Sequence, residues 1–496
     1  MYREEIEQYI EAHKHDMVED IFTLCRINSE KMPYEEGMPY GRGAATALAA
    51  ALSMAEKYGF AITNYDNYVG TADMNDKEKQ LDILAHLDVV PAGEGWKETE
   101  PFEPILKDGL LIGRGTADDK GPAVAALYAM RAVKELGIPL SKNVRLILGT
   151  DEECGSSDIE HYYGIEKEAP MTFSPDADFP VTNVEKGRLE AHFHGTFEPS
   201  AALPRLVGVD TGIKANVVPG KAQATVEGFE MTVLEECAAK TEQETGVRFM
   251  FEASADGEVS SPHVGSADGE VSPPHFGSAD GVDRSQVTIT AIGEGAHAAF
   301  LEGGNNALTG LLTLFKYLPF APCAQIDAVR GLVALMPHKD VTGIAMGIAM
   351  EDEISGPLTL AFSMLKVTDR ELNGVFDSRC PVCGNKENVL YVVRDKMTSI
   401  GLTLENQDMK EPHHVDGDSH FVKTLLRVYE EYTGLEGKCQ YTGGGTYVHD
   451  LKNGVAFGAT LPGTENRMHG ADEFAVLEEL VVSAKIFAQV IVDLCS

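Results

Sequence analysis

The sequence predicts an α/β fold in which a mainly parallel sheet with helices on both faces is interrupted by an inserted α+β domain with an antiparallel sheet. Three observations predict this fold. Over residues 1–185, short apolar runs alternate with helical patterns, as in parallel strands covered by helices. Over residues 186–385, apolar and polar residues alternate, which is typical of antiparallel strands. Residues 386–496 return to the first pattern.

The elements of the first region follow in order along the chain. Residues 3–25 carry apolar side chains at helical spacing, and the Ala-rich stretch 43–58 predicts a second helix. The apolar run LDILAHLDVV (81–90) predicts a buried strand. A helix is expected over 121–136, ending near a glycine, and VRLIL (144–148) predicts the next strand. Parallel strands of this kind place functional side chains in the loops at their carboxyl ends.

The inserted region contains a tandem repeat. SADGEVSSPHVG (254–265) is followed by SADGEVSPPHFG (266–277), and SADG then begins again. The repeat is small, polar and rich in proline and glycine, so it cannot supply a packed core. We expect a solvent-exposed loop expansion over 254–281.

Composition and charge narrow the classes of function. The chain has 496 residues, 43% of them hydrophobic, and a net charge of −37, which disfavours binding to nucleic acid or to anionic membranes. No apolar run reaches the roughly 18 residues of a membrane helix, and the amino-terminal segment has no signal-peptide core. The eight cysteines are scattered through the chain, which indicates reduced thiols in a cytoplasmic protein.

Chemistry-bearing side chains gather in four turns. They are AHLD with His86 and Asp88, the DDK turn with Asp118, TDEE with Glu152 and Glu153, and SPDAD with Asp176. His86 and Asp88 share one face of a strand, and a metal-binding imidazole commonly donates its second N–H to a carboxylate. Carboxylates crowded at one sheet edge would repel each other unless divalent cations lay between them.

Each turn alone is weak evidence, because acidic turns are more often solvated loops or helix caps. Taken in order, AHLDVVPAGEGW, GRGTADDKGP, GTDEECGSSD, SPDADFPV and MHGADEF resemble the dinuclear metallopeptidases that include aminoacylase, acetylornithine deacetylase, succinyl-diaminopimelate desuccinylase and carnosinase. The chain looks most similar to the bacterial Xaa-His dipeptidase branch (PepV or Sapep type). The resemblance implies a catalytic domain over 1–185 and 386–496, with a lid domain over 186–385.

The resemblance also implies the metal ligands. His86 and Asp176 would hold one metal, Glu153 and His469 the other, and Asp118 would bridge them. In such relatives the peptide bond after the bridging aspartate is often cis. Two divalent ions are expected, Zn²⁺ first, with Mn²⁺ or Co²⁺ as alternatives, since carboxylate and imidazole ligands suit all three.

Other residues would act on the substrate. By resemblance, Glu152 is the general base for a hydroxide that bridges the metals, and Asp88 is the partner of His86. The lid histidine His297 would stabilise the oxyanion. Substrate contacts are expected from three further residues: Asn216, Arg379, which suits a carboxylate, and Gly444, where a glycine lets the backbone approach closely.

The expected function is a dinuclear metal-dependent dipeptidase, a metallopeptidase that hydrolyses short peptides with a free carboxyl terminus. A lid longer than that of dimeric relatives suggests a monomer that supplies His297 from its own chain. The alternatives are an N-acyl-amino-acid deacylase of the acetylornithine or succinyl-diaminopimelate type, and a peptide-binding protein with a decayed site. A redox protein built on Cys380 and Cys383 lacks a thioredoxin-like context. Structural roles are expected for the remaining prominent histidines: His192, His194, His413, His414, His420 and His449.

Overall fold

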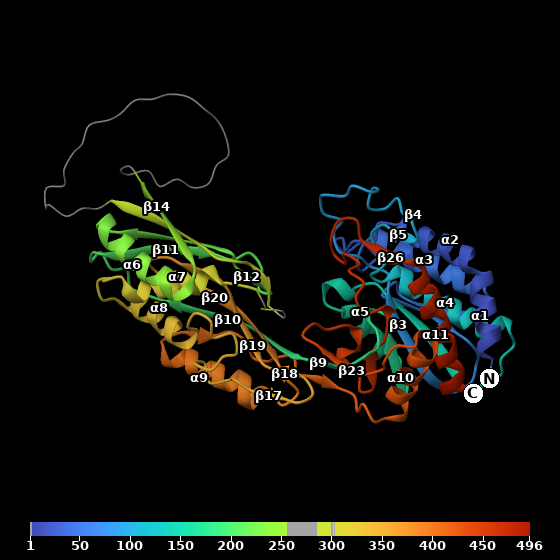
Figure 1. Ribbon diagram of the computed structural model, residues 1–496. Coiled ribbons are helices and arrows are strands. Elements are labelled where there is room, and N and C mark those ends of the chain that lie inside the picture. Colours follow the sequence, from blue (N-terminus) through green and yellow to red (C-terminus); the bar gives the residue numbers. More distant parts are fainter. Residues whose placement is uncertain (1, 255–284, 299–300, 302) are drawn as a thin grey trace. The chain divides into compact units, whose positions relative to one another are not determined.

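The computed structural model describes residues 2–254, 285–298, 301 and 303–496. The chain forms two compact units (Figure 1). Unit 1 is Met1–Glu185 with His413–Ser496, and unit 2 is Lys186–Pro412. The insertion therefore leaves and re-enters unit 1 through two neighbouring strands, which pair antiparallel with Glu185 opposite His413.

Unit 1 is built on a sheet with a parallel centre. The strand order is β1-β2-β6-β3-β7-β24-β9-β22, with β23 beside β9. The pairs β6–β3, β3–β7 and β7–β24 are parallel, and the strands beyond them include antiparallel pairs. The bounds are β1 (Ala61–Tyr65), β2 (Val69–Asp73), β3 (Lys79–His86), β6 (Asn143–Gly149), β7 (Met171–Ser174), β9 (Val181–Glu185), β22 (His413–His414), β23 (Cys439–Thr442) and β24 (Gly454–Ala456).

Helices cover both faces of this sheet, because its central strands are apolar on both sides. On β3, Ile83 and Ala85 face a core shared with α4 and α11, which pack against each other (Figure 1). Leu84 faces the opposite core, which α5 and the short helix η3 complete. The helices are α1 (Arg3–Ala12), α2 (Lys14–Cys25), α3 (Arg42–Lys57), α4 (Lys120–Glu135), η1 (Glu152–Cys154), α5 (Ser157–Tyr163), α10 (His420–Thr433), η3 (Tyr447–Asp450) and α11 (Leu477–Cys495).

Small sheets complete unit 1 beside the loops that follow the parallel strands. One consists of β4, β5 and β26, and the other pairs β8 with β25. Their bounds are β4 (Ile105–Lys107), β5 (Leu110–Ile112), β8 (Ala177–Asp178), β25 (Ala459–Thr460) and β26 (Phe474–Val476).

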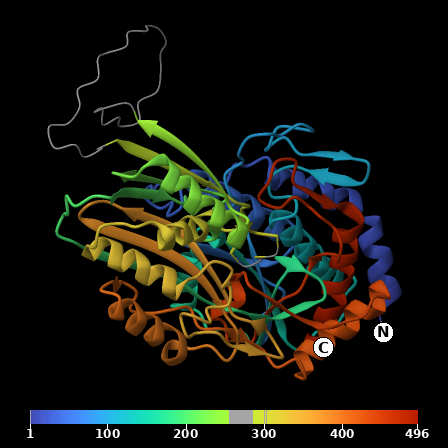
Figure 2. The same ribbon diagram turned by 60° about the vertical axis from the view of Figure 1, so that its left-hand side comes forward.

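Unit 2 is an antiparallel sheet with helices packed on it (Figure 2). The order is β14-β15-β13-β11-β19-β20-β10-β21. Along β10 buried residues alternate with more exposed ones, as the sequence pattern predicts. The bounds are β10 (Gly187–Thr196), β11 (Arg205–Thr211), β12 (Val217–Val218), β13 (Lys221–Glu227), α6 (Met231–Thr245), β14 (Arg248–Ser254), β15 (Gln286–Ile292), β16 (Ala296–His297), α7 (Ala307–Tyr317), α8 (Ala324–Leu335), β17 (Glu351–Asp352), β18 (Gly356–Pro357), β19 (Thr359–Val367), β20 (Glu371–Cys380), η2 (Lys386–Leu390), α9 (Tyr391–Ser399) and β21 (Thr403–Leu404).

The architecture agrees with the predicted fold class, while several boundaries differ. The single helix expected over 3–25 is two helices, separated at His13, whose ring nitrogen lies 2.8 Å from the Tyr9 carbonyl oxygen and whose ring stacks on Tyr9. Residues 386–412 belong with unit 2 rather than with the second part of unit 1, because β21 pairs with β10 and Val393 and Met397 enter the core of unit 2.

Two sequence predictions remain to be placed. The repeat-bearing loop expected over 254–281 lies outside the described residues, apart from Ser254 at the end of β14. Among the helices of the described residues, none combines the length and apolar character that a membrane span requires.

Candidate metal centre

The predicted metal ligands lie in unit 1, and three of them, His86, Glu153 and Asp176, lie at or just beyond the carboxyl ends of its parallel strands. There the chain leaves the sheet for a loop or a helix. His86 ends β3, Asp118 precedes α4, Glu153 lies in η1 after β6, Asp176 follows β7, and His469 precedes β26. Segments far apart in sequence thus present acidic and imidazole groups at one place.

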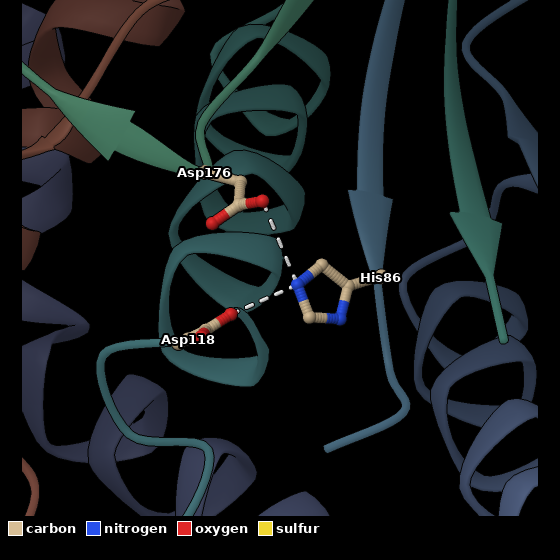
Figure 3. Close-up of side chains that lie close together, drawn as sticks. All are labelled: His86, Asp118 and Asp176. Carbon is tan, nitrogen blue, oxygen red and sulfur yellow. Dashed lines mark ion pairs between the residues drawn. The ribbon is translucent and has the colours of Figure 1, made fainter. Parts of the chain in front are cut away.

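One group of candidate ligands consists of His86, Asp118 and Asp176 (Figure 3). The Nε2 atom of His86 lies 2.9 Å from Asp118 Oδ1 and 3.7 Å from Asp176 Oδ2. His86 is fully buried, and the ligand atoms of the group lie within 4.8 Å of one another. One imidazole nitrogen and two carboxylates at this spacing suit a divalent cation.

A second group consists of Asp118, Glu153 and His469. His469 Nε2 lies 2.9 Å from Asp118 Oδ2 and 3.3 Å from Glu153 Oε1. Asp118 therefore belongs to both groups, with one carboxylate oxygen toward each histidine. This is the arrangement that a bridging carboxylate requires. The peptide bond between Asp118 and Asp119 is cis, as the resemblance implies.

Two buried ligand atoms support a metal at this position. His86 Nε2 and Glu153 Oε1 have no hydrogen-bond partner within the described part of the chain, although each lies within ion-pairing distance of another candidate ligand. Buried polar atoms are normally hydrogen-bonded. A cation would satisfy both atoms, so the donor set fits divalent metal ions.

The pKa values of the candidate ligands are shifted by burial and by the charges and hydrogen bonds of their neighbours. Burial and the neighbouring Asp118 charge raise the pKa of Asp176 to about 7. Burial also tends to raise the pKa of Asp118, but hydrogen bonds from His469 and His86 bring it below its ordinary value. Hydrogen bonds to Asp118 and Glu153 raise the pKa of His469 to about 10. Bound cations would take the place of these protons and keep the carboxylates ionised.

Asp88 holds two parts of the centre in place. Its Oδ1 and Oδ2 accept hydrogen bonds from the backbone N–H groups of Glu152 and Glu153, at 3.2 and 3.1 Å. The same carboxylate lies 3.4 Å from His86 Nδ1, and the Asp88 carbonyl oxygen lies 3.1 Å from that atom. Asp88 thus orients the acidic turn as well as the imidazole, whereas the sequence predicted only its contact with His86.

Glu152 lies in the same turn among negative charges. Burial raises the pKa of Glu152 well above its ordinary value, and the charges of Asp176 and Glu153 add to that rise. A carboxyl group whose pKa is raised in this way suits proton transfer near neutral pH.

Tyr447 and Asp158 support this turn from behind, and the sequence reasoning missed both. The Tyr447 hydroxyl donates a hydrogen bond of 2.5 Å to Asp158 Oδ2, which also accepts the backbone N–H groups of Thr150 and Asp151. The Tyr447 ring lies edge-on to His86, with centroids 6.2 Å apart. The GGGTY segment (443–447) was a usable signal for Tyr447, and Asp158 is the last residue of the motif GTDEECGSSD, although the resemblance assigned it no role.

Gly444 lies in unit 1, in the loop after β23. Its N–H donates to Thr442 Oγ1 at 3.0 Å. The loop is anchored by the buried carboxylate of Glu185, which accepts hydrogen bonds from the backbone N–H and the hydroxyl of Thr446. The loop that contains Gly444 is therefore fixed by hydrogen bonds to Thr442 and Glu185.

Three predicted residues lie in unit 2. β12 and β16 pair with Val217 opposite His297, and this brings Asn216 Nδ2 to 3.4 Å from His297 Nε2. Arg379 on β20 is buried, and its guanidinium donates to both oxygens of Asp377, at 2.6 and 3.2 Å. Burial, together with the Arg379 charge, lowers the pKa of His297. The neutral form of this imidazole is therefore favoured.

The remaining histidines and the cysteine pair have other surroundings. His192 and His194 lie beside Glu190 and Glu405, and the ring nitrogens of His413 and His449 lie 2.7 and 2.9 Å from the Gly454 carbonyl oxygen and Glu185. Among the residues that the structure describes, clusters of three or more potential metal ligands occur only at the two groups above. Cys380 and Cys383 are free thiols, the first buried and the second exposed.

Comparison with known proteins places these observations in a family. A family model described as "Peptidase family M20/M25/M40" matches residues 83–493. Similar sequences include "Putative dipeptidase YtjP" of Bacillus subtilis (strain 168), 33% identical over 495 residues and 97% of each chain. "Beta-Ala-Xaa dipeptidase" of Lactobacillus delbrueckii subsp. lactis is 32% identical over 488 residues, covering 98% of this chain and 97% of the relative.

Solved structures share the fold at low sequence identity. Human carnosine dipeptidase 1 matches with a TM-score of 0.57 at 14% identity, covering 100% of this chain and 99% of that one. Aminoacylhistidine dipeptidase from Vibrio alginolyticus matches with a TM-score of 0.55 at 14% identity, covering 95% of each chain. These matches support the architecture of both units.

Proposed function

The chain belongs to peptidase family M20/M25/M40, and from this premise we propose that it is a dinuclear metal-dependent dipeptidase acting on short peptides with a free carboxyl terminus. The observation that carries the proposal is the placement of Asp118, with one carboxylate oxygen toward His86 and the other toward His469. The names of the similar full-length sequences favour a dipeptidase over an N-acyl-amino-acid deacylase or a decayed binding protein.

Five side chains would hold the two metals. His86 and Asp176 would bind one ion, Glu153 and His469 the other, and Asp118 both. When bound, divalent cations at this site supply Lewis acidity that polarises the scissile carbonyl and makes water more acidic. The mixed imidazole and carboxylate donors favour Zn²⁺ in this proposal, with Mn²⁺ and Co²⁺ as substitutes.

Glu152 would move the proton. In its ionised form it takes a proton from the attacking water, and it then delivers that proton to the departing amine nitrogen. Burial, with the charges of Asp176 and Glu153, raises its pKa, which favours uptake of that proton. Asp88 would keep Glu152 in place through the backbone of the turn.

Substrate recognition would fall to four residues: His297, Asn216, Arg379 and Gly444. We assign His297 and Asn216 to the carbonyl oxygen and backbone of the peptide, because β12 and β16 hold their side chains 3.4 Å apart. Arg379 would bind the free carboxylate, since Asp377 fixes the plane of its guanidinium. Gly444 would let the loop backbone approach the peptide closely. The division into a catalytic domain and a lid, a monomeric state and a cytoplasmic location belong to the same proposal.

The test is a substrate and metal panel. Chelated protein is reconstituted with Zn²⁺, Mn²⁺ or Co²⁺ and assayed with β-alanyl-histidine, Leu-Leu, acetylornithine and succinyl-diaminopimelate. We expect hydrolysis of a dipeptide in the presence of metal and no turnover after chelation. Turnover of the acylated amino acids alone would contradict the proposed substrate class, and turnover that survives complete removal of metal would contradict the metal requirement.

A further inference from the structure

Arg114 and Glu473 form a buried ion pair next to Asp118 of the candidate metal centre. Arg114 belongs to the turn between β5 and α4, and Glu473 directly precedes β26. Their exposed fractions are 1% and 0%, and Arg114 Nη1 donates to Glu473 Oε2 at 2.5 Å. A buried ion pair rarely adds much net stability compared with apolar packing. Its hydrogen bonds to neighbouring groups therefore indicate its role.

The second oxygen of Glu473 holds the turn that ends at the bridging aspartate. Its Oε1 accepts hydrogen bonds from the backbone N–H groups of Gly115 and Ala117 at 3.0 Å, and from that of Asp118 at 3.3 Å. Gly115 has a φ of +87°, in the left-handed region that favours glycine. This conformation lets the turn direct its N–H groups at one carboxylate.

Arg114 extends the contact to the segment that follows His86. Its Nη2 donates to the carbonyl oxygens of Pro91 and Ala92, both at 3.3 Å. The guanidinium also lies over the ring of Trp96, 5.5 Å from its centroid. Glu473 itself follows the metal-binding candidate His469 by four residues. The segments that carry the candidate ligands His86, Asp118 and His469 therefore all contact or contain this ion pair.

From these contacts we infer that Arg114 and Glu473 are positioning residues that set the location of Asp118 relative to the two histidines, and so control how tightly the metal ions are held. The inference rests on the proposed function, since it assigns a task to residues around the proposed ligands. A carboxylate with one oxygen toward three backbone donors and the other toward an arginine has a single favourable orientation. A small displacement of Asp118 would disturb both metal positions together.

Two variants test the inference, with metal binding as the readout. Glu473→Gln keeps the size of the side chain, but its amide N–H group faces either Arg114 or the backbone donors, so one set of hydrogen bonds is lost. Arg114→Lys keeps the charge but not the fork of donors. The matched control is Asp73→Asn, which disrupts the Arg145–Asp73 pair, whose side chains are 15% exposed, elsewhere in the same unit.

Apparent metal affinity is measured by competition with a chromogenic chelator, metal content by mass spectrometry, and folding by circular dichroism and Tm. We expect Glu473→Gln to lose about 10- to 100-fold in affinity for the more weakly held metal, and Arg114→Lys to lose less in the same direction. The control should lower Tm while its metal affinity stays within about twofold. If Glu473→Gln does not fold, Arg114→Lys decides by the same criterion.

Equal losses of Tm in Glu473→Gln and the control, with wild-type metal affinity in both, would overturn the positioning role. The readout separates this failure from failure of the proposed function. A wild-type protein that binds two metals but hydrolyses no dipeptide contradicts the substrate class and leaves the affinity comparison intact. A wild-type dipeptidase whose variants retain both metals contradicts only the positioning role.

Discussion

Glu152 and Glu153 are neighbours in the chain but have different surroundings. The Glu153 carboxylate lies 3.3 Å from His469 Nε2, in a ligand's position. The pKa of Glu152 is raised by burial and then by the Asp176 charge. The different roles that we propose for them, base for Glu152 and ligand for Glu153, rest on these different surroundings.

Replacing Glu152 should separate metal binding from turnover. We expect Glu152→Gln to retain both metals and to lose about 10²- to 10⁴-fold in kcat, the usual contribution of a general base. The measurement pairs steady-state kinetics with metal analysis. Glu160→Gln, at an exposed position of the following helix α5, is the control and should behave as wild type. Near-normal kcat in Glu152→Gln would contradict the assigned role.

Asp82 links a single residue to the pH dependence of stability. It is fully buried on β3, and burial raises its pKa to about 6, although Lys79 and Arg145 oppose the shift. Because this value lies above the roughly 3.9 of an unfolded chain, the folded state binds the proton more tightly. Ionisation of Asp82 therefore lowers stability as the pH rises from about 4 to about 6, and the loss stays constant above that range.

The Asp82→Asn variant cannot titrate at this position. We expect the free energy of unfolding of the variant, minus that of the wild type, to be larger at pH 7.5 than at pH 5.0. The total increase of this difference from pH 4 upward is at most about 3 kcal/mol. Urea titrations at the two pH values give this difference, and contributions of distant groups cancel in it. A difference that falls with pH, or stays constant, would show that Asp82 is ionised throughout.

At the scale of secondary-structure elements, the short helix η1 depends on side chains from elsewhere in the chain. Tyr447 in η3 donates to Asp158 at the start of α5, and Asp158 in turn holds the loop before η1. The contact joins two elements that cover one face of the sheet. The acidic turn is therefore positioned by its packing, since three residues of helix have little stability alone.

Removal of this hydroxyl should cost measurable stability. We expect Tyr447→Phe to lower the free energy of unfolding by about 1–3 kcal/mol, because a buried carboxyl group loses a partner. Tyr163→Phe is the control, since its hydroxyl is buried with no hydrogen-bond partner among the described residues; that variant should be neutral or slightly more stable. Equal effects on the midpoints of denaturant unfolding would contradict the account of η1.

The sequence predicted individual elements well where a local pattern was present. The apolar run at β3, the Ala-rich α3 and the alternation along β10 each carry their own signal. The break at His13 did not, because the apolar pattern continues across this residue, whose φ of −105° and ψ of 9° are not helical. A periodicity average does not detect a single non-helical residue.

The candidate site was predictable only in part, for the same physical reason. The five proposed ligands lie in short sequence motifs that follow one another in a distinctive order, so the resemblance of these motifs was enough to identify them as candidates. Arg114 and Glu473 are separated by 358 intervening residues, and their contact exists only once the sheet has formed. Asp88 was assigned one contact and makes several, because its backbone partners lie on another strand's loop.

At the scale of the whole molecule, the insertion determines how the chain is divided. Unit 2 has its own core, which includes residues from α9 and β21 that the sequence pattern assigned to the other unit. The sequence patterns of α9 and β21 resemble those of the helices and strands of unit 1. These patterns alone therefore could not show where the chain re-enters unit 1. The paired strands β9 and β22 mark that point in the structure.

The oligomeric state follows from the proposal that one chain supplies every site residue. We expect sedimentation velocity to show a single species near the chain mass of 53.6 kDa over a wide range of protein concentration. A net charge of −37 also disfavours self-association at low ionic strength. The run is therefore repeated at higher salt, and a stable dimer under both conditions would contradict the monomer.

The central claim is that five dispersed side chains bind two metal ions through a shared aspartate. Anomalous scattering from a crystal grown with Zn²⁺ tests it most directly. Two peaks about 3.5–4 Å apart are expected, one beside His86 and Asp176, the other beside Glu153 and His469, with Asp118 between them. A single peak, or two peaks not joined by Asp118, would contradict the account.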